Sequence, residues 1–250
     1  MSEPGATAGR VPVEGPTPPV GVIGGVGPLA TAYFLQRVVQ LTDAERDQEH
    51  VDLIVLNHAT IPDRTEFVLG RSTDDPGPVL ARDARRLEAF GVRFLVMPCN
   101  TAHYFTQQVL DAITVPFLSI VDVTVSAARR RAPDARAVGL LATAGTVASR
   151  VYHEAFARQG LDVVTPDADD QRLVNEVIYD QVKAGRPSDP DTLRAVAGRL
   201  GDRGAGVVVL GCTELSVAAV DHDLLDEPPF CDSMDELVRA TIVRAGHRVR

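Results

Sequence analysis

"VGVIGGVGPLA", residues 20–30, joins an unbroken apolar run to a glycine-rich turn and a helix start at Pro28. An apolar run without polar alternation is typical of a strand buried on both faces, and proline is favoured in the first turn of a helix. The stretch predicts a buried strand at 20–24 and a helix over 28–41. Its glycines do not form G-x-G-x-x-G, so we expect a tight turn that approaches a small ligand, not a dinucleotide site.

The same alternation continues along the chain. Further strands are predicted at 51–56, 93–98, 115–120, 137–142, 161–166, 206–211 and 228–232. Further helices are predicted at 76–90, 101–112, 121–131, 146–159, 168–184, 190–203 and 233–246. Continuous apolar strands that alternate with helices predict an α/β fold with mostly parallel sheets covered by helices on both faces.

The chain contains two similar halves. "VGLLATAGT" begins at Val138, 118 residues after Val20 (138 − 20 = 118). "GVVVLGCTE" likewise repeats "RFLVMPCNT" and places Cys212 113 residues after Cys99 (212 − 99 = 113). These offsets predict two copies of one α/β unit. Because open α/β sheets bind ligands beyond the carboxyl ends of their strands, two facing units would present both cysteines to one cleft.

Composition limits the class of protein. The chain has 250 residues, 45% hydrophobic and 24% charged, which is ordinary for a globular protein. A net charge of −9 argues against nucleic acid as a partner, and no apolar run is long enough for a membrane span. Residues 1–19, rich in Pro and Gly, predict a disordered tail. Three cysteines without clustered spacing predict reduced thiols in the cytoplasm and no zinc site.

Two facing thiols suggest proton transfer at carbon. If a substrate lies between Cys99 and Cys212, one thiolate can remove a proton from one face while the other thiol supplies a proton to the opposite face. The configuration at that carbon is then inverted. We expect helices to start at Asn100/Thr101 and at Thr213, where free N–H groups would favour a thiolate and bind a carboxylate.

Several residues keep a structural alternative. A single cysteine at a strand end is more often a buried apolar residue, and we interpret Cys231 in this way because it has no counterpart. His103 lies four residues after Cys99 and raises a Cys–His hydrolase as an alternative. Since Ser216 occupies the equivalent place after the second cysteine, a structural role for His103 is favoured. His58 could line the cleft.

Two cationic residues are candidate carboxylate ligands. Lys183 is the only lysine of the chain, and a compact ammonium suits contact with a carboxylate. Arg64 follows a strand–loop junction in "IPDRTEF", where its planar fork could bind a carboxylate through two hydrogen bonds. A solvated surface position remains the alternative for each.

Six motifs in order resemble the aspartate/glutamate racemase superfamily over about residues 20–246. They are "VIGGVGPLAT", "IPDRT", "MPCNTAHYF", "GLLATAGT", "IYDQVKAG" and "LGCTELS". "GGVGPLA" and "GCTE" are similar to the aspartate racemases, which use no pyridoxal phosphate. The resemblance implies two flavodoxin-like α/β domains with the active site in the cleft between them. We expect a tail at 1–19, a first domain of 20–116 plus 227–250, and a second domain of 117–226.

The resemblance also implies roles for individual residues. Cys99 and Cys212 would be the two acid/base catalysts, with no cofactor and no metal. The expected substrate-binding residues are Asn57, Arg64, Asn100, Thr101, Thr143, Lys183 and Thr213. Of these, Arg64 and Lys183 match the positions that bind the side-chain carboxylate of aspartate. A homodimer acting on a small acidic amino acid is implied.

Other functions remain open at this point. The chain could be a glutamate racemase, a racemase of broader range for acidic amino acids, a maleate isomerase or an arylmalonate-type decarboxylase; decarboxylases of this kind typically retain one cysteine. A small-anion binding protein would need no paired thiols. A pyridoxal-phosphate racemase, with Lys183 as the Schiff base, is a further alternative. Substrate length is open because one methylene changes binding by only ~1–3 kcal/mol.

Overall fold

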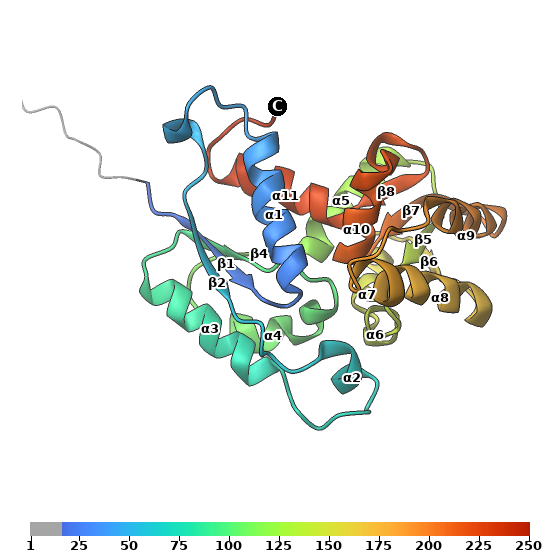
Figure 1. Cartoon of the computed structure of the whole chain (residues 1–250), viewed down its shortest axis with the longest axis horizontal. Coiled ribbons are helices and arrows are strands. Elements are labelled where there is room, and N and C mark those ends of the chain that lie inside the picture. Colours follow the sequence, from blue (N-terminus) through green and yellow to red (C-terminus); the bar gives the residue numbers. More distant parts are fainter. Residues whose placement is uncertain (1–16) are drawn as a thin grey trace, which may run out of the picture.

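Two four-stranded parallel sheets form the framework of the protein (Figure 1). The computed structural model describes residues 17–250, so most of the predicted tail, 1–16, lies outside the described residues. The first sheet has the order β2-β1-β3-β4 and the second the order β6-β5-β7-β8. The strands are β1 (Val20–Gly24), β2 (Leu53–Asn57), β3 (Phe94–Val96), β4 (Phe117–Leu118), β5 (Ala137–Leu141), β6 (Asp162–Val164), β7 (Ala205–Leu210) and β8 (Phe230–Asp232). The eight predicted strands and the α/β class are confirmed.

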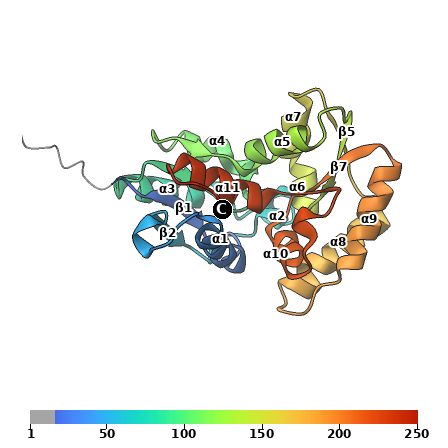
Figure 2. The same ribbon diagram turned by 90° about the horizontal axis from the view of Figure 1, so that it is seen from above.

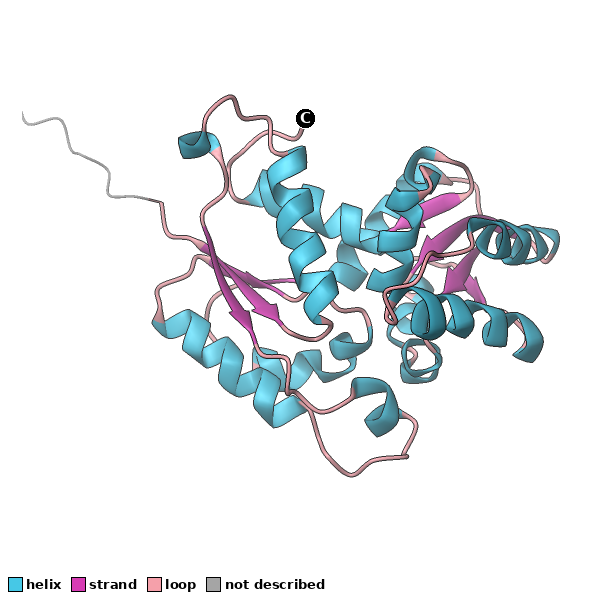
Figure 3. Cartoon of the chain, in the orientation of Figure 1, coloured by secondary structure: helices cyan, strands magenta, loops and turns pink. Residues whose placement is uncertain are grey.

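Helices cover both sheets (Figure 3). They are α1 (Pro28–Leu41), α2 (Arg64–Val68), α3 (Gly77–Ala89), α4 (Thr106–Leu110), α5 (Ile120–Arg131), α6 (Ala144–Ser149), α7 (Val151–Ala157), α8 (Ala168–Asn175), α9 (Pro190–Asp202), α10 (Thr213–Asp221) and α11 (Ser233–Arg244). Short 3₁₀ turns occupy Asp47–Glu49, Thr101–Phe105 and Leu224–Asp226, and a π-helix occupies Glu176–Val182. Among residues 17–250, none of the helices combines the length and the apolar character of a membrane span.

Three predicted helices differ from expectation. The helix predicted over 101–112 begins as the 3₁₀ turn Thr101–Phe105 and continues as α4. The helix predicted over 146–159 is divided into α6 and α7 at Arg150, which has a left-handed backbone with φ of 59°. The helix predicted over 168–184 changes from α8 to the π-helix at Glu176. The short helix α2 was not predicted. By contrast, α1 has the predicted bounds, with Pro28 at its start.

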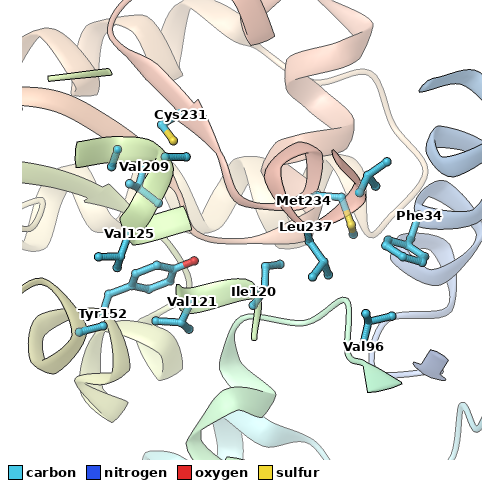
Figure 4. Close-up of a cluster of buried hydrophobic side chains, with 14 of the residues drawn as sticks. Phe34, Val96, Ile120, Val121, Val125, Tyr152, Val209, Cys231, Met234 and Leu237 are labelled. Atoms are coloured by element: carbon cyan, nitrogen blue, oxygen red, sulfur yellow. The ribbon is translucent and has the colours of Figure 1, made fainter. Parts of the chain in front are cut away.

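The last helix joins the two halves of the molecule. α11 packs against α1 and α5 and lies between the two sheets (Figure 2). Met234 and Leu237 of α11 lie between Phe34 of α1 and the apolar residues of α5 in one continuous core (Figure 4). Cys231 is fully buried in the same core, in agreement with a structural role.

The predicted division into domains remains a proposal. Strand pairing places β4 in the first sheet and β8 in the second. If each domain keeps its own sheet, the first boundary falls after Leu118 instead of 116, and the second falls after Asp232 instead of 226. We propose these boundaries in place of the original ones.

Candidate active site

A cavity of about 360 Å³, the space at its open mouth included, lies beyond the ends of β1, β3, β5 and β7. Its lining residues come from both halves: Val26, Asp63, Arg64, Thr65, Cys99, Asn100, Thr101, Thr143, Lys183, Cys212, Thr213 and Glu214. Every predicted site residue except Asn57 is among them. Asn57 is exposed at the end of β2, outside this lining.

The two cysteines reach the cavity in different ways. Cys99 lies just beyond β3, where its backbone N–H donates to the carbonyl of Met97 at 2.8 Å. Cys212 is the residue that precedes α10 and its carbonyl accepts from the N–H of Leu215 at 3.0 Å. Both side chains are buried, with 7% and 5% of their surface exposed.

Burial dominates the acidity of both thiols. It raises the pKa of Cys99, and the charge of Arg64 and the N–H of Ala102 oppose this only in part. Burial raises the pKa of Cys212 well above its ordinary value, and Glu214 raises it further by its charge and its hydrogen bond. Backbone N–H groups do favour the thiolates, that of Ala102 at Cys99 and that of Glu214 at Cys212, but desolvation of the charged sulfur outweighs them.

Glu214 is a buried carboxylate in the cavity that sequence reasoning did not single out. The Sγ of Cys212 donates to Glu214 Oε2 at 3.0 Å, and the hydroxyl of Thr213 donates to the same oxygen at 3.3 Å. The other oxygen, Oε1, lies 3.8 Å from the Nζ of Lys183. The carboxylate therefore connects one thiol with the only lysine of the chain.

Lys183 reaches the cavity from the end of the π-helix. Its backbone N–H donates to the carbonyl of Ile178, five residues earlier, at 3.0 Å. The wider turn changes the direction in which the following side chains leave the helix, and such turns often occur at functional sites. Burial works to lower the pKa of Lys183, but the effects that raise it, of which the negative charge of Glu214 is the largest, leave the pKa raised. Lys183 is therefore a cation in the cavity.

Arg64 is the first residue of α2, and one of its donors is unused within the part of the chain that the structure describes. Its Nη1 donates to the carbonyls of Ile61 at 3.3 Å and Pro62 at 3.0 Å. Its Nε is buried and has no hydrogen-bond partner among residues 17–250. A buried donor of this kind is costly unless a ligand satisfies it. The arrangement leaves part of the guanidinium available to an anion.

Three threonine hydroxyls from both halves meet beside the cysteines. The hydroxyl of Thr101 lies 3.1 Å from that of Thr143 and 2.8 Å from that of Thr146, and the last two are 3.0 Å apart. Thr146 was not predicted as a site residue. Its backbone N–H donates to the hydroxyl of Thr143, which caps α6. A Cβ at the intervening Gly145 would lie 2.8 Å from the Cα of Thr65, so α2 packs closely on α6.

The side chain of Asn100 holds the Cys99 loop in place. Its Oδ1 accepts from the Tyr152 hydroxyl at 2.5 Å, and its Nδ2 donates to the Ser233 hydroxyl at 3.0 Å. Ser233 in turn donates to the carbonyl of Leu210, at the end of β7, at 2.7 Å. These buried bonds connect the loops of both cysteines, and the second amide hydrogen is the one side-chain donor of Asn100 that they leave for a ligand.

The two histidines considered earlier lie outside the cavity lining. His103 has its Nδ1 2.7 Å from the carbonyl of Cys99, and its Nε2 accepts from the N–H of Ile120 at 3.1 Å. Burial lowers the pKa of His103 to about 4, so the ring is neutral. Both ring nitrogens are occupied by backbone groups, which argues against a Cys–His hydrolase. The Nδ1 of His58 pairs with Asp83 at 2.5 Å.

A second cavity of about 790 Å³ adjoins the first. The two share Asp63, Arg64, Lys183 and Glu214, and the second is further lined by Gly25, Gly27, Pro28, Leu29, Ala59 and Ile61. The predicted glycine turn thus borders the site. A Cβ at Gly25 would lie 2.3 Å from the backbone of His58, so only glycine fits there. Over the described part of the chain, no three His, Cys, Asp or Glu side chains are arranged to hold a metal ion.

The sequence and the structure of the chain are both similar to those of known racemases. A family model described as Asp/Glu/Hydantoin racemase matches residues 23–241. The broad specificity amino-acid racemase RacX of Bacillus subtilis is 27% identical over 229 residues, covering 89% of this chain and 96% of that protein. The structure of Picrophilus torridus aspartate racemase has 30% identity and a TM-score of 0.76, covering 93% and 96% of the two chains. An aspartate racemase homologue from Pyrococcus horikoshii has 25% identity and a TM-score of 0.74, covering 91% and 99%.

Proposed function

The chain belongs to the Asp/Glu/Hydantoin racemase family, and from this premise we propose that it is a cofactor-independent racemase that inverts aspartate. The observation that carries the proposal is the pairing of Cys99 and Cys212. They follow equivalent strands of the two sheets, β3 and β7, and line one cavity. A hydrolase or a binding protein has no use for two thiols placed in this way.

In the proposed reaction one cysteine acts as base and the other as acid. A thiolate removes the hydrogen from the α-carbon, and the thiol on the opposite face donates its proton to the same carbon. The product has the inverted configuration, and the two sulfurs have exchanged protonation states. The opposite enantiomer reacts by the same steps with the roles of Cys99 and Cys212 exchanged.

The cations at the cavity support an acidic substrate. Arg64 has a buried donor without a partner among residues 17–250, and Lys183 contributes a second positive charge. We propose that Arg64 binds the side-chain carboxylate, with Lys183 nearby. Thr101, Thr143 and Thr213 would bind the α-carboxylate or the amino group.

A broader range of amino acids is the second candidate. The adjoining cavity, whose volume of about 790 Å³ includes the space at its open mouth, is also lined by Arg64 and Lys183 and could take side chains longer than that of aspartate. The Bacillus subtilis relative RacX is a broad specificity amino-acid racemase. Comparing several substrates therefore decides between the two candidates.

One experiment tests the proposal. The purified protein is incubated with single L-amino acids in deuterated water, without added pyridoxal phosphate. The enantiomers are then separated by chiral chromatography, and their deuterium content is measured by mass spectrometry. We expect D-aspartate with one deuterium at the α-carbon. Cys99→Ser and Cys212→Ser should abolish it, whereas Cys231→Ala, in the core away from the cavity, serves as the control. No inversion of any amino acid would refute the proposal.

We further propose a homodimer in the cytoplasm. The dimer follows from the resemblance of the sequence alone, and all three cysteines are free thiols, as expected in a reducing compartment. Light scattering of the purified protein should give twice the mass of one chain. A monomer at the concentrations of the assay would contradict the dimer.

A further inference from the structure

The two cysteines have different charged neighbours. Cys212 donates to the carboxylate of Glu214, with Sγ and Oε2 3.0 Å apart. Cys99 instead experiences chiefly the positive charge of Arg64, which lowers its pKa against the effect of burial. The site is symmetric in its strands but not in its charges.

The position of the proton between Cys212 and Glu214 follows from the surroundings of the carboxylate. Lys183 Nζ lies 3.8 Å from Oε1, and both the Thr213 hydroxyl and the Sγ of Cys212 donate to Oε2, so the carboxylate faces a cation and two donors. An ionised carboxylate only accepts hydrogen bonds. The proton shared by Sγ and Oε2 therefore belongs to the sulfur.

Ionising Cys212 would place two negative charges side by side. The thiolate and the Glu214 carboxylate would lie within about 3 Å of each other in a buried site, where such repulsion is strong. The penalty at Cys99 is smaller, because the largest charge effect on its pKa is the lowering by Arg64, and the raising effect of Glu214 ranks below it. The sulfur of Cys212 is therefore harder to ionise than that of Cys99.

We propose that Glu214 keeps Cys212 protonated in the free enzyme, so that Cys99 is the sulfur that serves as the resting base. Glu214 is a positioning residue, because it acts through Cys212 and not on the substrate. The inference rests on the proposed racemisation by both cysteines. It goes beyond that proposal by assigning the starting protonation states.

The inference has a kinetic signature. The enantiomer whose α-hydrogen faces Cys99 binds the abundant form of the enzyme, whereas its mirror image needs the rare form with Cys212 ionised. Binding to a rare form weakens the apparent affinity in proportion to its population. Because the equilibrium constant of a racemisation is one, kcat/KM is equal for both enantiomers. The enantiomer deprotonated by Cys212 must therefore have a higher KM and a higher kcat by the same factor.

Glu214→Gln tests this signature because it keeps the shape of the side chain and removes its charge. We expect the ratio of the two KM values, and that of the two kcat values, to fall by about tenfold or more, equivalent to at least one pKa unit. Glu176→Gln, at a half-buried position at the start of the π-helix, is the matched control and should leave both ratios unchanged. Unchanged ratios in Glu214→Gln would overturn the inference.

A second measurement needs no racemase activity. In the double variant Cys99→Ser, Cys231→Ala, Cys212 is the only thiol, and its rate of alkylation by iodoacetamide against pH reports its ionisation. We expect the midpoint to fall by about one pH unit or more when Glu214→Gln is added. A midpoint at or below about 8.5 with Glu214 in place would overturn the inference, even if the Gln variant does not fold. Failure of the proposed function, by contrast, would appear as absent inversion in the native protein.

Discussion

Replacing Arg64 by alanine should show whether Arg64 binds the side-chain carboxylate of the substrate. The side chain enters the cavity from the start of α2 and keeps a buried Nε without a partner among the described residues. If this donor binds the side-chain carboxylate of aspartate, Arg64→Ala removes a hydrogen bond between two charged groups. The loss should then depend on the charge of the substrate side chain.

The size of the effect follows from the type of bond. A hydrogen bond to a charged group contributes about 1.5–3 kcal/mol, so kcat/KM for aspartate should fall by about 10- to 150-fold at 1.36 kcal/mol per factor of ten. A second effect arises because the charge of Arg64 lowers the pKa of Cys99. Its loss raises that pKa and slows the reaction of every substrate alike.

The assay separates these effects by a ratio. Exchange of the α-hydrogen in deuterated water is measured for aspartate and for asparagine, which has the same shape without the charge. Their ratio cancels the effect on Cys99 and should fall by the 10- to 150-fold above in Arg64→Ala. Arg71→Ala, an exposed arginine beyond the end of α2, is the control. Equal losses for aspartate and asparagine would refute the assignment of Arg64 to the side-chain carboxylate.

Four further predictions follow from the site. Cys212→Ser should abolish net racemisation, yet α-hydrogen exchange of one enantiomer should survive; near-normal rates in both directions would exclude the two-cysteine scheme. Because burial raises the pKa of both cavity thiols and the base is a thiolate, the rate should rise with pH above neutrality, and a flat profile from about pH 6 to 9 would contradict this. Tyr152→Phe leaves Oδ1 of Asn100 without its donor and should lower the free energy of unfolding in urea by about 1–3 kcal/mol, with a loss below about 0.5 kcal/mol counting against the buried network. Gly145→Val should clash with the backbone of Thr65 and cost about 1–3 kcal/mol with a raised KM; unchanged stability and KM would show that α2 need not pack there.

The strands and the first helix could be predicted from sequence because short apolar runs and helix-start residues mark their positions locally. Val20–Gly24 is buried throughout, so its apolar run indicated a strand covered on both faces. Pro28 marks the first residue of α1. Elsewhere the chain departs from regular periods: the left-handed Arg150 and the π-helix that precedes Lys183 depend on tertiary packing, which local pattern does not report.

Some missed features did have a local signal. Asp63 precedes α2 and caps it by accepting the N–H of Glu66, and an acidic or hydroxyl residue followed by Glu three positions later is a known helix start. Glu214 stands in "GCTELSVAA", where a carboxylate in an otherwise apolar run indicates a buried ion with a partner. Its cationic partner could not be read from sequence, because Lys183 is 31 residues away (214 − 183 = 31).

The site residues were predicted mainly by matched motifs, and geometry then changed some of their roles. The cysteine pair and the two cations lie in one cavity as expected. Asn100, expected to bind substrate, uses its side chain chiefly to hold Tyr152 and Ser233. A motif indicates that a residue is needed. Only the structure shows whether that residue can contact a ligand or instead supports a loop.

The hydrogen bonds of Ser233 have a consequence for how the protein is made. This one hydroxyl bridges Asn100, beside the first cysteine, and the end of β7, just before the second. Translation proceeds from the amino end, so both thiols leave the ribosome before the residue that fixes their loops. Nascent chains that stall before α11 therefore display two cysteines without the geometry that makes them useful.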